Sequence, residues 1–434
     1  MESRRSITML MLIACLVLFG FASPALKSEP VTISFSYWGS AHEHEIWTEV
    51  LEAFADHHPD IHIDPLYVTG SYSSKMRVMI AAGTAPDVMN WEDKLGLPLV
   101  PTGAFMDLKP LMEKDPSFQR QAYYPITLED FQFKGQQWAL PWDFITTCLI
   151  YNKDLFDGVG VGHPPYPWQD DHWNWQSFIE TAKKLTIDKD GDGTPDQWGF
   201  PNTYSWSRWR LWVWQNGGLD WEPTGTRSLL TSEPTVSALQ FIADMTHLHR
   251  ISPTQTQINQ LGGELKMFTE QRVGMATAAA YNLPYFRDNY TFRWDLAAFA
   301  RGPVRNASPL IPDGVTISSQ TKHVDEAWEL VKFIIGLNAQ RIMAERGYRI
   351  SPRRDVLAKF ITPLTPQREE VWIEAVDHGI LTNYTTEWTN IEVDTIRPAI
   401  QGLLNGLYSA RQMVEQINPK IESLLGQAET RFAR

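Results

Sequence analysis

The sequence predicts an α/β protein of two lobes with a ligand cleft between them. Three observations favour this fold. Strand and amphipathic-helix patterns alternate before residue 138, they alternate again after residue 157, and a β-branched, apolar strand over residues 144–151 lies between the two halves. A strand of this length can belong to both lobes, and the gap between such lobes is a natural ligand cleft. The length of 434 residues also suits two domains.

The N-terminus has the pattern of a secretory signal. Arg4 and Arg5 precede an apolar run over residues 9–21, which is too short to span a bilayer and ends near small residues. We therefore expect residues 1–25 to be a signal peptide and the mature chain to begin between residues 21 and 27. The protein would then cross the cytoplasmic membrane and work in the periplasm or at the cell surface.

The chain contains two cysteines, Cys15 and Cys148. Residues 12–15 match a lipid-attachment box, but residues 16–19 continue the apolar run instead of starting a polar tether, so we expect no lipid anchor at Cys15. The exported chain then has a single thiol and forms no internal disulfide. Cys148 lies inside the predicted apolar strand, where we expect a buried, unreactive side chain.

Charge and aromatic content narrow the range of partners. The formal net charge is −13, and since Glu2, Arg4 and Arg5 in the signal sum to +1, the mature chain carries −14. Nucleic acid and anionic membranes are therefore poor partners. Of the 18 Trp residues, many lie in short polar loops rather than on periodic apolar faces, which indicates that some of them bind a ligand.

The first half of the mature chain reads as a βαβαβ unit. Strands are predicted at 31–38, 61–67 and 87–91, with helices at 43–57 and 72–82 between them. Right-handed crossovers make such a sheet parallel, and ligands bind beyond the carboxyl ends of its strands. This geometry selects residues 38–40 and 90–93.

The second half has the same alternation. Helices are predicted at 175–185 and 234–249 and from Asp325, strands before Tyr281 and at 294–299, and mostly helix after residue 352. Residues 313–318 and 347–352 look like a second and a third crossing between the lobes.

At AAGTAPDV (81–88) the sequence resembles the family 1 extracellular solute-binding proteins, the group of ABC-importer receptors that includes maltose-binding protein. The resemblance continues through LPWDF (140–144), YNKDLF (151–156), NWQSFIETAKKLT (174–186), DKDGDGTPDQWGF (188–200), QNGG (215–218), MFTEQRVGM (267–275), DEAWELVKFI (325–334) and RISPRRDV (349–356). Each motif is short, but their number and order make the set specific. Together they cover nearly all of the mature chain.

The resemblance implies a type II periplasmic-binding-protein fold, with each lobe a mostly parallel sheet flanked by helices and hinge strands between the lobes. We expect the N-terminal lobe at 30–145 and 314–348, and the C-terminal lobe at 146–313 and 349–434. The family's function implies a mono- or oligosaccharide ligand, which lobe closure presents to the transmembrane subunits of an ABC permease. No cofactor is required, and we expect a monomer.

The predicted ligand-binding residues are Trp38, Gly39, Ser40, Glu43, Trp91, Glu92, Asp93, Trp142, Asp143, Trp206, Trp209, Tyr281, Gly314, Tyr348 and Arg349. Trp91 and the two acids after it match the family position where an aromatic ring and a carboxylate face the sugar. The environment of the Trp38 side chain is left open, because the period-two alternation of the strand can also direct it into the core. Trp206, Trp209 and Trp212 are spaced by three, which would place them in a stripe on one helix face, and such a stripe is usually part of a core. We nevertheless expect one of them, Trp206 or Trp209, to reach the cleft. Tyr281 stands where many members of the family have Trp.

These residue types suit a neutral sugar. The C–H-rich face of a pyranose packs on an indole, and carboxylates accept hydrogen bonds from pairs of hydroxyls. Arg208 and Arg349 are the only cations that the sequence places near the cleft. Neutral glycans are therefore favoured over uronates.

An aspartate-rich loop has the spacing of a calcium site. Oxygen-bearing side chains occur at every second position, at Asp188, Asp190, Asp192, Thr194 and Asp196. The twelfth position is Gly199 rather than Glu, so the usual bidentate ligand is missing. The loop is either a structural calcium site or a turn in which aspartates accept backbone N–H groups, and in both cases it lies away from the cleft.

The rival function is a secreted glycan-degrading enzyme, a hydrolase or lyase, which would also be acidic and rich in Trp. Glu43 and Glu45 could in principle supply an acid and a nucleophile. Their place at a helix start favours dipole stabilisation instead, and no motif of a hydrolase, zinc protease or nucleotide-binding loop occurs. We therefore expect no enzyme activity. The five histidines between residues 42 and 62 are also not expected to bind metal, because four helical turns separate them and no Cys assists.

Overall fold

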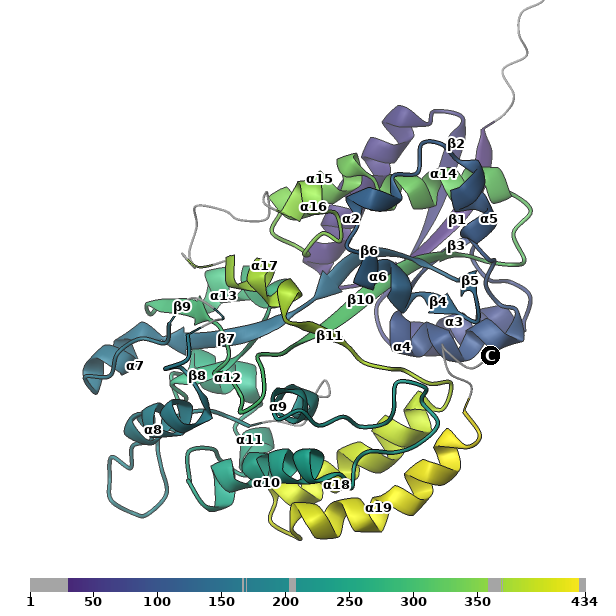
Figure 1. Cartoon of the computed structure of the whole chain (residues 1–434). Coiled ribbons are helices and arrows are strands. Elements are labelled where there is room, and N and C mark those ends of the chain that lie inside the picture. The colour runs from purple at the N-terminus through teal and green to yellow at the C-terminus, as the bar shows by residue number, and fades with distance from the viewer. Residues whose placement is uncertain are drawn as a thin grey trace, which may run out of the picture.

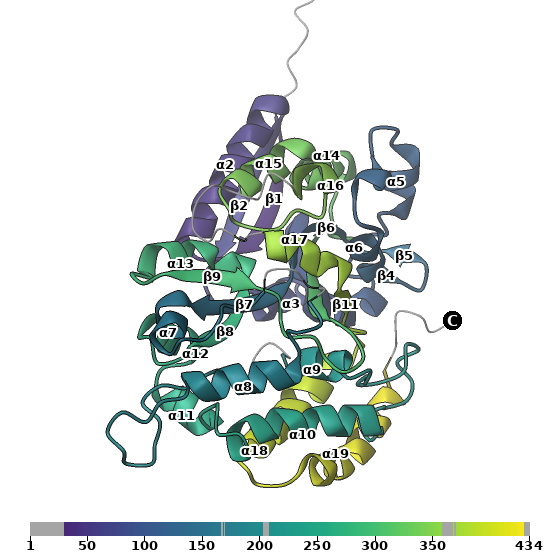
Figure 2. The ribbon, with the colours of Figure 1, turned by 60° about the vertical axis from the view of Figure 1, so that its left-hand side comes forward.

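The computed structural model describes residues 30–165, 168, 170–202, 208–357, 368 and 370–428. Two lobes are visible, each with its own sheet, and long strands run from one lobe to the other (Figure 1, Figure 2). The predicted signal, the box at Cys15 and Trp206 lie outside the described residues, as does the side chain of Asp93. No helix within the described ranges is long and apolar enough to cross a membrane.

The larger sheet has six strands. They are β1 (Val31–Trp38), β2 (Ile61–Val68), β3 (Val88–Glu92), β6 (Leu140–Ile145), β10 (Ser308–Ile317) and β11 (Gly379–Leu381). Their order is β11-β10-β3-β1-β2, and β6 pairs with the free side of part of β10. β1 is parallel to β2 and β3, which confirms the predicted βαβαβ unit, whereas β10 runs antiparallel to β3 and β6.

Two crossover helices, α2 (Ala41–His57) and α3 (Tyr72–Ala81), join these first strands. α2 begins at a capping box, in which the Ser40 hydroxyl accepts the Glu43 N–H and the Glu43 carboxylate accepts the Ser40 N–H. Its residues Ile46, Trp47, Val50 and Phe54 are buried. α14 (Val324–Ile335) and α15 (Leu337–Glu345) contact α2 and complete this layer (Figure 1).

The second sheet has three strands, β7 (Thr147–Asn152), β8 (Met275–Ala279) and β9 (Trp294–Ala297). β7 is the central strand and is antiparallel to both neighbours. The α/β class is confirmed, but the mostly parallel sheet expected in each lobe is not found here, because an apolar run defines a buried strand without defining its direction. Thr147 pairs with Ala279, so the start of β7 and the end of β8 meet at one edge of the sheet.

The crossing expected as one strand over 144–151 is divided at Thr146. β6 ends at Ile145 in the larger sheet, and β7 begins at Thr147 in the smaller one. Two further segments run beside this junction. The hydroxyl of Ser308 in β10 accepts the Thr147 N–H at 3.2 Å, and the Ile350 carbonyl accepts the Phe144 N–H at 3.1 Å. The first and third predicted crossings therefore meet at the waist of the molecule (Figure 1). The second passes there at Ser308, at the start of β10, and not at the predicted residues 313–318, because residues 313–317 already pair with β3 inside the larger sheet.

Helices fill the rest of the second lobe. The main ones are α8 (Trp175–Leu185), α9 (Trp209–Gln215), α10 (Glu233–His247), α18 (Arg397–Leu404) and α19 (Ala410–Leu425), with the π-helix η5 (Thr389–Ile396) before α18. The shorter elements, which belong to both lobes, are α4 (Asp93–Gly96), η1 (Leu97–Thr102), α5 (Lys109–Lys114), η2 (Arg120–Ala122), α6 (Pro125–Asp130), β4 (Gln132–Phe133), β5 (Gln136–Gln137), α7 (Lys153–Gly158), α11 (Gln255–Gln260), α12 (Glu264–Thr269), η4 (Ala280–Asn282), α13 (Leu283–Asn289), α16 (Arg354–Leu357) and α17 (Glu370–Asp377). Cys148 is buried and free, as predicted.

A buried ion cluster anchors α9. Arg210 Nε lies 2.7 Å from Asp220 Oδ2, and its Nη2 lies 2.9 Å from Glu392 Oε2 in the π-helix. The guanidinium also covers the ring of Trp209 at 4.3 Å. Because the pairing offsets the cost of burying these charges, the start of α9 is held in place, and with it Arg208, which reaches the cavity described next.

Candidate functional site

A cavity of about 210 Å³ lies between the two sheets. The larger sheet and its helices contribute Trp38, Glu43, Glu92, Lys94, Ile145, Pro309, Ile311 and Asp313, and the rest of the lining is Thr147, Arg208, Ala279, Tyr281 and Arg349. Trp38 and Glu92 are the last residues of β1 and β3, so the carboxyl-end rule located this side of the cavity. The other side is formed by the edge where β7 begins and β8 ends.

Arg349 is the most highly connected side chain of the site. Its Nη2 lies 3.2 Å from Glu43 Oε1, and its Nη1 lies 3.1 Å from Asp143 Oδ2 and 3.8 Å from Asp313 Oδ2. The ring of Tyr281 lies 5.5 Å from the guanidinium carbon and that of Tyr348 lies 5.0 Å from it. One cation thus joins α2, β6 and β10 to the aromatic side of the second lobe.

Burial changes the proton affinities of this cluster. Loss of solvent raises the pKa of Asp143 to about 6, against the opposing effect of the Arg349 charge. Burial, together with the charge of Asp143, raises the pKa of Asp313 well above its ordinary value. The guanidinium of Arg349 itself stays charged, because the surrounding tyrosine and carboxylates raise its pKa despite desolvation.

The other two cations of the cavity also contact acids. Lys94 Nζ lies 2.7 Å from Glu92 Oε2. Arg208 pairs with Glu264, whose other oxygen accepts the Thr277 N–H at 2.8 Å. The cavity therefore offers charged groups whose charges are already compensated within the protein, which suits hydroxyl groups better than a carboxylate or phosphate.

Two aromatic side chains face the cavity from opposite lobes. Trp38 is half-buried and leans on Tyr72 at a centroid distance of 4.8 Å. Tyr281, also half-buried, follows β8 in the short helix η4, and burial raises the pKa of its hydroxyl, which keeps it neutral. Each ring can pack on the apolar face of a sugar.

Three of the predicted stacking residues are instead in the core. Trp91 is fully buried and contacts Tyr72 and Phe105. Trp142 and Trp209 are each 1% exposed. None of the three lines the cavity. The expectation that they present a ring to the ligand is therefore not met in this structure, because neighbouring helices and loops cover faces that a strand or helix pattern alone leaves undecided.

Five other predicted site residues lie outside the cavity lining and position the residues that form it. Asp143 and Tyr348 contact Arg349. Ser40 caps α2, and Gly39, with φ at 151°, has no room for a side chain, since a Cβ would lie 2.7 Å from Glu43 Cβ. Gly314 lets β10 approach the core, because a Cβ there would meet a ring carbon of Phe131 at 2.6 Å. None of these five lines the cavity.

Sequence reasoning missed several lining residues as ligand candidates. They are Lys94, Ile145, Thr147, Ala279, Pro309, Ile311 and Asp313. Three of them, Ile145, Thr147 and Asp313, lie in the predicted crossings, so for these three the hinge position was the available signal. The charge of Lys94 beside two acids was a second signal.

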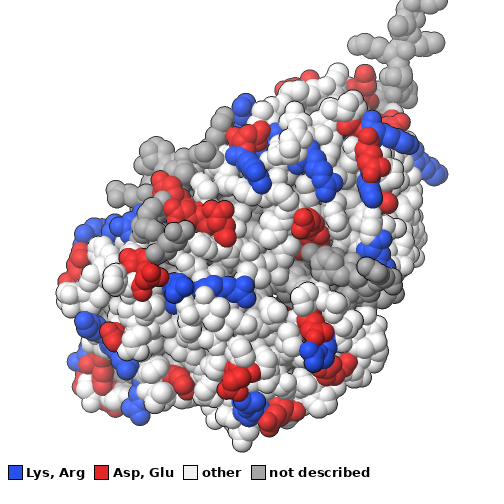
Figure 3. Space-filling model, viewed as in Figure 1, with Lys and Arg blue, Asp and Glu red and all other residues white. Residues whose placement is uncertain are grey.

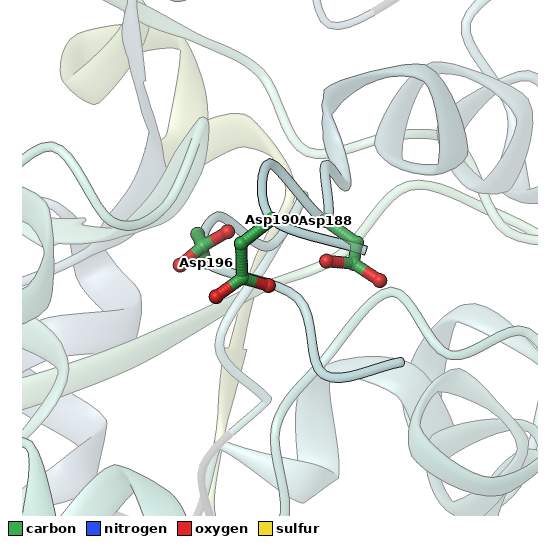
Figure 4. Close-up of side chains that lie close together, drawn as sticks. All are labelled: Asp188, Asp190 and Asp196. Atoms are coloured by element: carbon green, nitrogen blue, oxygen red, sulfur yellow. The ribbon is translucent and has the colours of Figure 1, made fainter. Parts of the chain in front are cut away.

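The aspartate loop follows α8 in the second lobe, and none of its residues lines the cavity. Figure 4 shows the side chains of Asp188, Asp190 and Asp196 close together. One carboxylate oxygen from each of Asp188, Asp190 and Asp196 lies within 4.8 Å of the others, which fits a cation. The same carboxylates accept loop amides, with Asp188 bonded to the N–H groups of Gly191 and Gly193 at 2.8 Å. These bonds lower the pKa of Asp188. The twelfth loop position, Gly199, has no side chain to supply a ligand, and the fold excludes a larger residue there, because a Cβ would clash with the Ala182 carbonyl oxygen.

Comparison with known proteins gives one family and a consistent fold. The model of the bacterial extracellular solute-binding protein family matches residues 40–340. An ABC substrate-binding protein from Listeria monocytogenes in complex with cycloalternan is 21% identical with a TM-score of 0.82, and the match covers 92% of this chain and 100% of that one.

Two other solved structures agree. A cyclic alpha-maltosyl-1,6-maltose binding protein from Arthrobacter globiformis is 15% identical, with a TM-score of 0.77 over 92% of this chain and 100% of that one. Maltose-bound MalE3 from T. maritima is 20% identical, with a TM-score of 0.74 over 91% of this chain and 100% of that one. At these identities the likeness establishes the two-lobe fold.

Proposed function

We propose, from the premise that this chain belongs to the bacterial extracellular solute-binding proteins, that it binds a neutral sugar or oligosaccharide between its lobes and delivers it to an ABC permease. We place the mature protein outside the cytoplasmic membrane, as a monomer, and put the lobe boundary at the change of sheet between Ile145 and Thr147. The solved structures described above include proteins in complex with cycloalternan and with maltose.

The observation that carries this proposal is the composition of the cavity between the sheets. Trp38 and Tyr281 offer aromatic faces from the two lobes, while Glu43 and Glu92 offer hydrogen-bond acceptors. Sugars combine an apolar face with ring hydroxyls and therefore match such a mixture. The pairing of every described cation in the cavity with an acid argues against an anionic ligand.

Binding would work by closure rather than by chemistry. A sugar that touches both lobes is bound more tightly by the closed form than by the open one, and only this difference shifts the population. The face drawn in Figure 3 carries interspersed acidic and basic side chains rather than a single basic field, consistent with a small neutral ligand rather than nucleic acid.

A thermal-shift panel tests the proposal. Maltose, cycloalternan and cyclic maltosyl-maltose represent neutral sugars, and glucuronate represents an anionic one. We expect at least one neutral sugar to raise the melting temperature, because a ligand that binds only the folded state stabilises it by mass action. Stabilisation by glucuronate alone would contradict the proposal.

Variants then locate the site. We expect Trp38→Ala and Tyr281→Ala each to weaken binding by roughly 1–3 kcal/mol, the scale of one buried apolar side chain, which is about one to two decades in Kd. Tyr285→Ala is the matched control, because Tyr285 is 37% exposed on α13 and does not line the cavity. Equal losses in all three variants would contradict the site.

The rival function, a secreted glycan-degrading hydrolase or lyase, has one observation in its favour. Asp313 lines the cavity with a raised pKa, as a general acid would. However, Glu43 forms an ion pair with Arg349, and Glu92 forms one with Lys94. These pairs occupy the carboxylates that a hydrolase would need as a free nucleophile. Incubation with the panel sugars distinguishes the two, since reducing ends that increase with time would favour the enzyme.

A further inference from the structure

Asp313 lies opposite two other acids in the sheet. β10 pairs with β3 on one side, where Asp313 is opposite Glu92, and with β6 on the other, where it is opposite Asp143. Like charges at directly opposed positions of a sheet destabilise each other. The Asp313 side chain is 3% exposed, so water does little to screen this repulsion.

The guanidinium of Arg349 lies closer to two other acids than to Asp313. Arg349 Nη1 lies 3.1 Å from Asp143 Oδ2 but 3.8 Å from Asp313 Oδ2, and its Nη2 binds Glu43. Asp143 also accepts the backbone N–H of Asp313 at 3.0 Å. Lys94 Nζ, on α4, lies 2.7 Å from Glu92 Oε2, and its charge lowers the pKa of Asp313 by less than burial and the Asp143 charge raise it.

One carboxyl oxygen of Asp313 is unsatisfied. In the part of the chain that the structure describes, its Oδ1 has no hydrogen-bond partner although it is buried. A buried anion with an unused oxygen is expensive, whereas a protonated carboxyl group avoids the charge. Among the three acids around Arg349, Asp313 is the most distant from the guanidinium and therefore the one to take the proton.

We propose that Asp313 is protonated at neutral pH and donates its hydroxyl hydrogen to a ligand oxygen that can only accept, such as a ring or glycosidic oxygen of a saccharide. The donor role rests on the proposed sugar-binding function, but the protonation does not. Burial and the neighbouring Asp143 raise the pKa of Asp313, in agreement with the geometry.

This assignment has a chemical use. Ionised Glu43 and Glu92 can only accept hydrogen bonds, and so serve sugar hydroxyls that donate. An ether oxygen needs a donor. A neutral carboxylic acid provides one without adding a charge to the cavity.

Infrared difference spectroscopy of the full mature protein without ligand tests the protonation. We expect the spectrum of wild type minus Asp313→Asn at neutral pH to contain the C=O band of a protonated carboxylic acid, which shifts in D2O. Asn is nearly isosteric with Asp, and circular dichroism checks its fold. A difference spectrum without this band would overturn the proposal.

Asp143→Asn provides the second measurement, which does not depend on the first variant folding. Removal of the Asp143 charge lowers the pKa of Asp313, so we expect the acid band to disappear at a lower pH than in wild type. A band that is lost entirely in Asp143→Asn at every pH would assign the proton to Asp143 and overturn the proposal.

The panel sugar that gives the largest thermal shift tests the donor role. Its affinity for wild type should fall about tenfold for each pH unit above the pKa of Asp313. Asp313→Asn, whose amide donates at every pH, should bind independently of pH over that range. A wild-type affinity that does not change with pH would overturn the donor role. If none of the sugars shifts the melting temperature, the proposed function is overturned, but the infrared band still decides whether Asp313 is protonated.

Discussion

The indole of Trp91 lies beneath the strand end that carries Glu92 to the cavity, where Tyr72 and Phe105 enclose it. We expect Trp91→Ala to lower the free energy of unfolding by about 3–5 kcal/mol, the usual range for emptying a buried aromatic site. Denaturant unfolding measures this loss. Trp38→Ala is the matched control, since Trp38 borders the cavity and should lose sugar affinity with little change in stability. A stable Trp91→Ala protein would show that the ring is not a core residue.

Arg349 holds three acids together at the centre of the site. Its removal by Arg349→Met leaves buried carboxylates without a counter-charge, and we expect a loss of about 3–5 kcal/mol at neutral pH. The raised pKa of Asp143, about 6, means that its folded-state charge disappears as pH falls below this value. The loss caused by Arg349→Met should therefore shrink between pH 7 and pH 4.

Unfolding of both proteins across this pH range measures the effect. Arg346→Met is the control, because Arg346 is 56% exposed and its pair with Glu49 at 2.7 Å lies in water. Such an exposed pair contributes about 0–1 kcal/mol. An equal destabilisation by Arg349→Met at all pH values would indicate lost packing rather than lost charge compensation.

At the scale of elements, the role of the aspartate loop after α8 depends on whether the loop binds a metal ion. If Asp188, Asp190 and Asp196 hold calcium, chelation should lower the melting temperature, because binding to the folded loop stabilises it. Sugar affinity should stay unchanged, since these residues do not line the cavity. A melting curve that responds to neither chelator nor added calcium would leave the loop as a turn stabilised by its own amide bonds.

At the scale of the whole molecule, we propose that the two lobes close about the waist. Three segments cross there, at the junction of β6 and β7, in β10, and at Ile350 beside Phe144. Short crossings of this kind let two rigid lobes rotate with few backbone changes. We expect a stabilising panel sugar to reduce the radius of gyration in solution scattering and to change the Trp emission. Trp38→Ala should require more sugar to reach the same compaction, and an unchanged radius at saturating sugar would contradict closure.

The sequence by itself determined the elements and their approximate roles. Period-two and helical patterns located β1, α2, β2, α3 and β3, because each pattern reflects one buried face of one element. The carboxyl ends of the first strands pointed to Trp38 and Glu92, since parallel strands end at one edge. Short motifs in a specific order indicated the family.

Only the tertiary structure decided which of several equivalent side chains meet in the cavity. Trp38 and Trp91 both stand near strand ends and both contact Tyr72, but Phe105 also packs on Trp91, which is fully buried, whereas Trp38 is half-buried and lines the cavity. The antiparallel pairing of β7 with β8 and β9, and the meeting of Asp143 with Asp313 and Arg349, each join residues more than a hundred positions apart. Local periodicity shows that a face is buried, whereas the identity of what covers it depends on how distant segments pack.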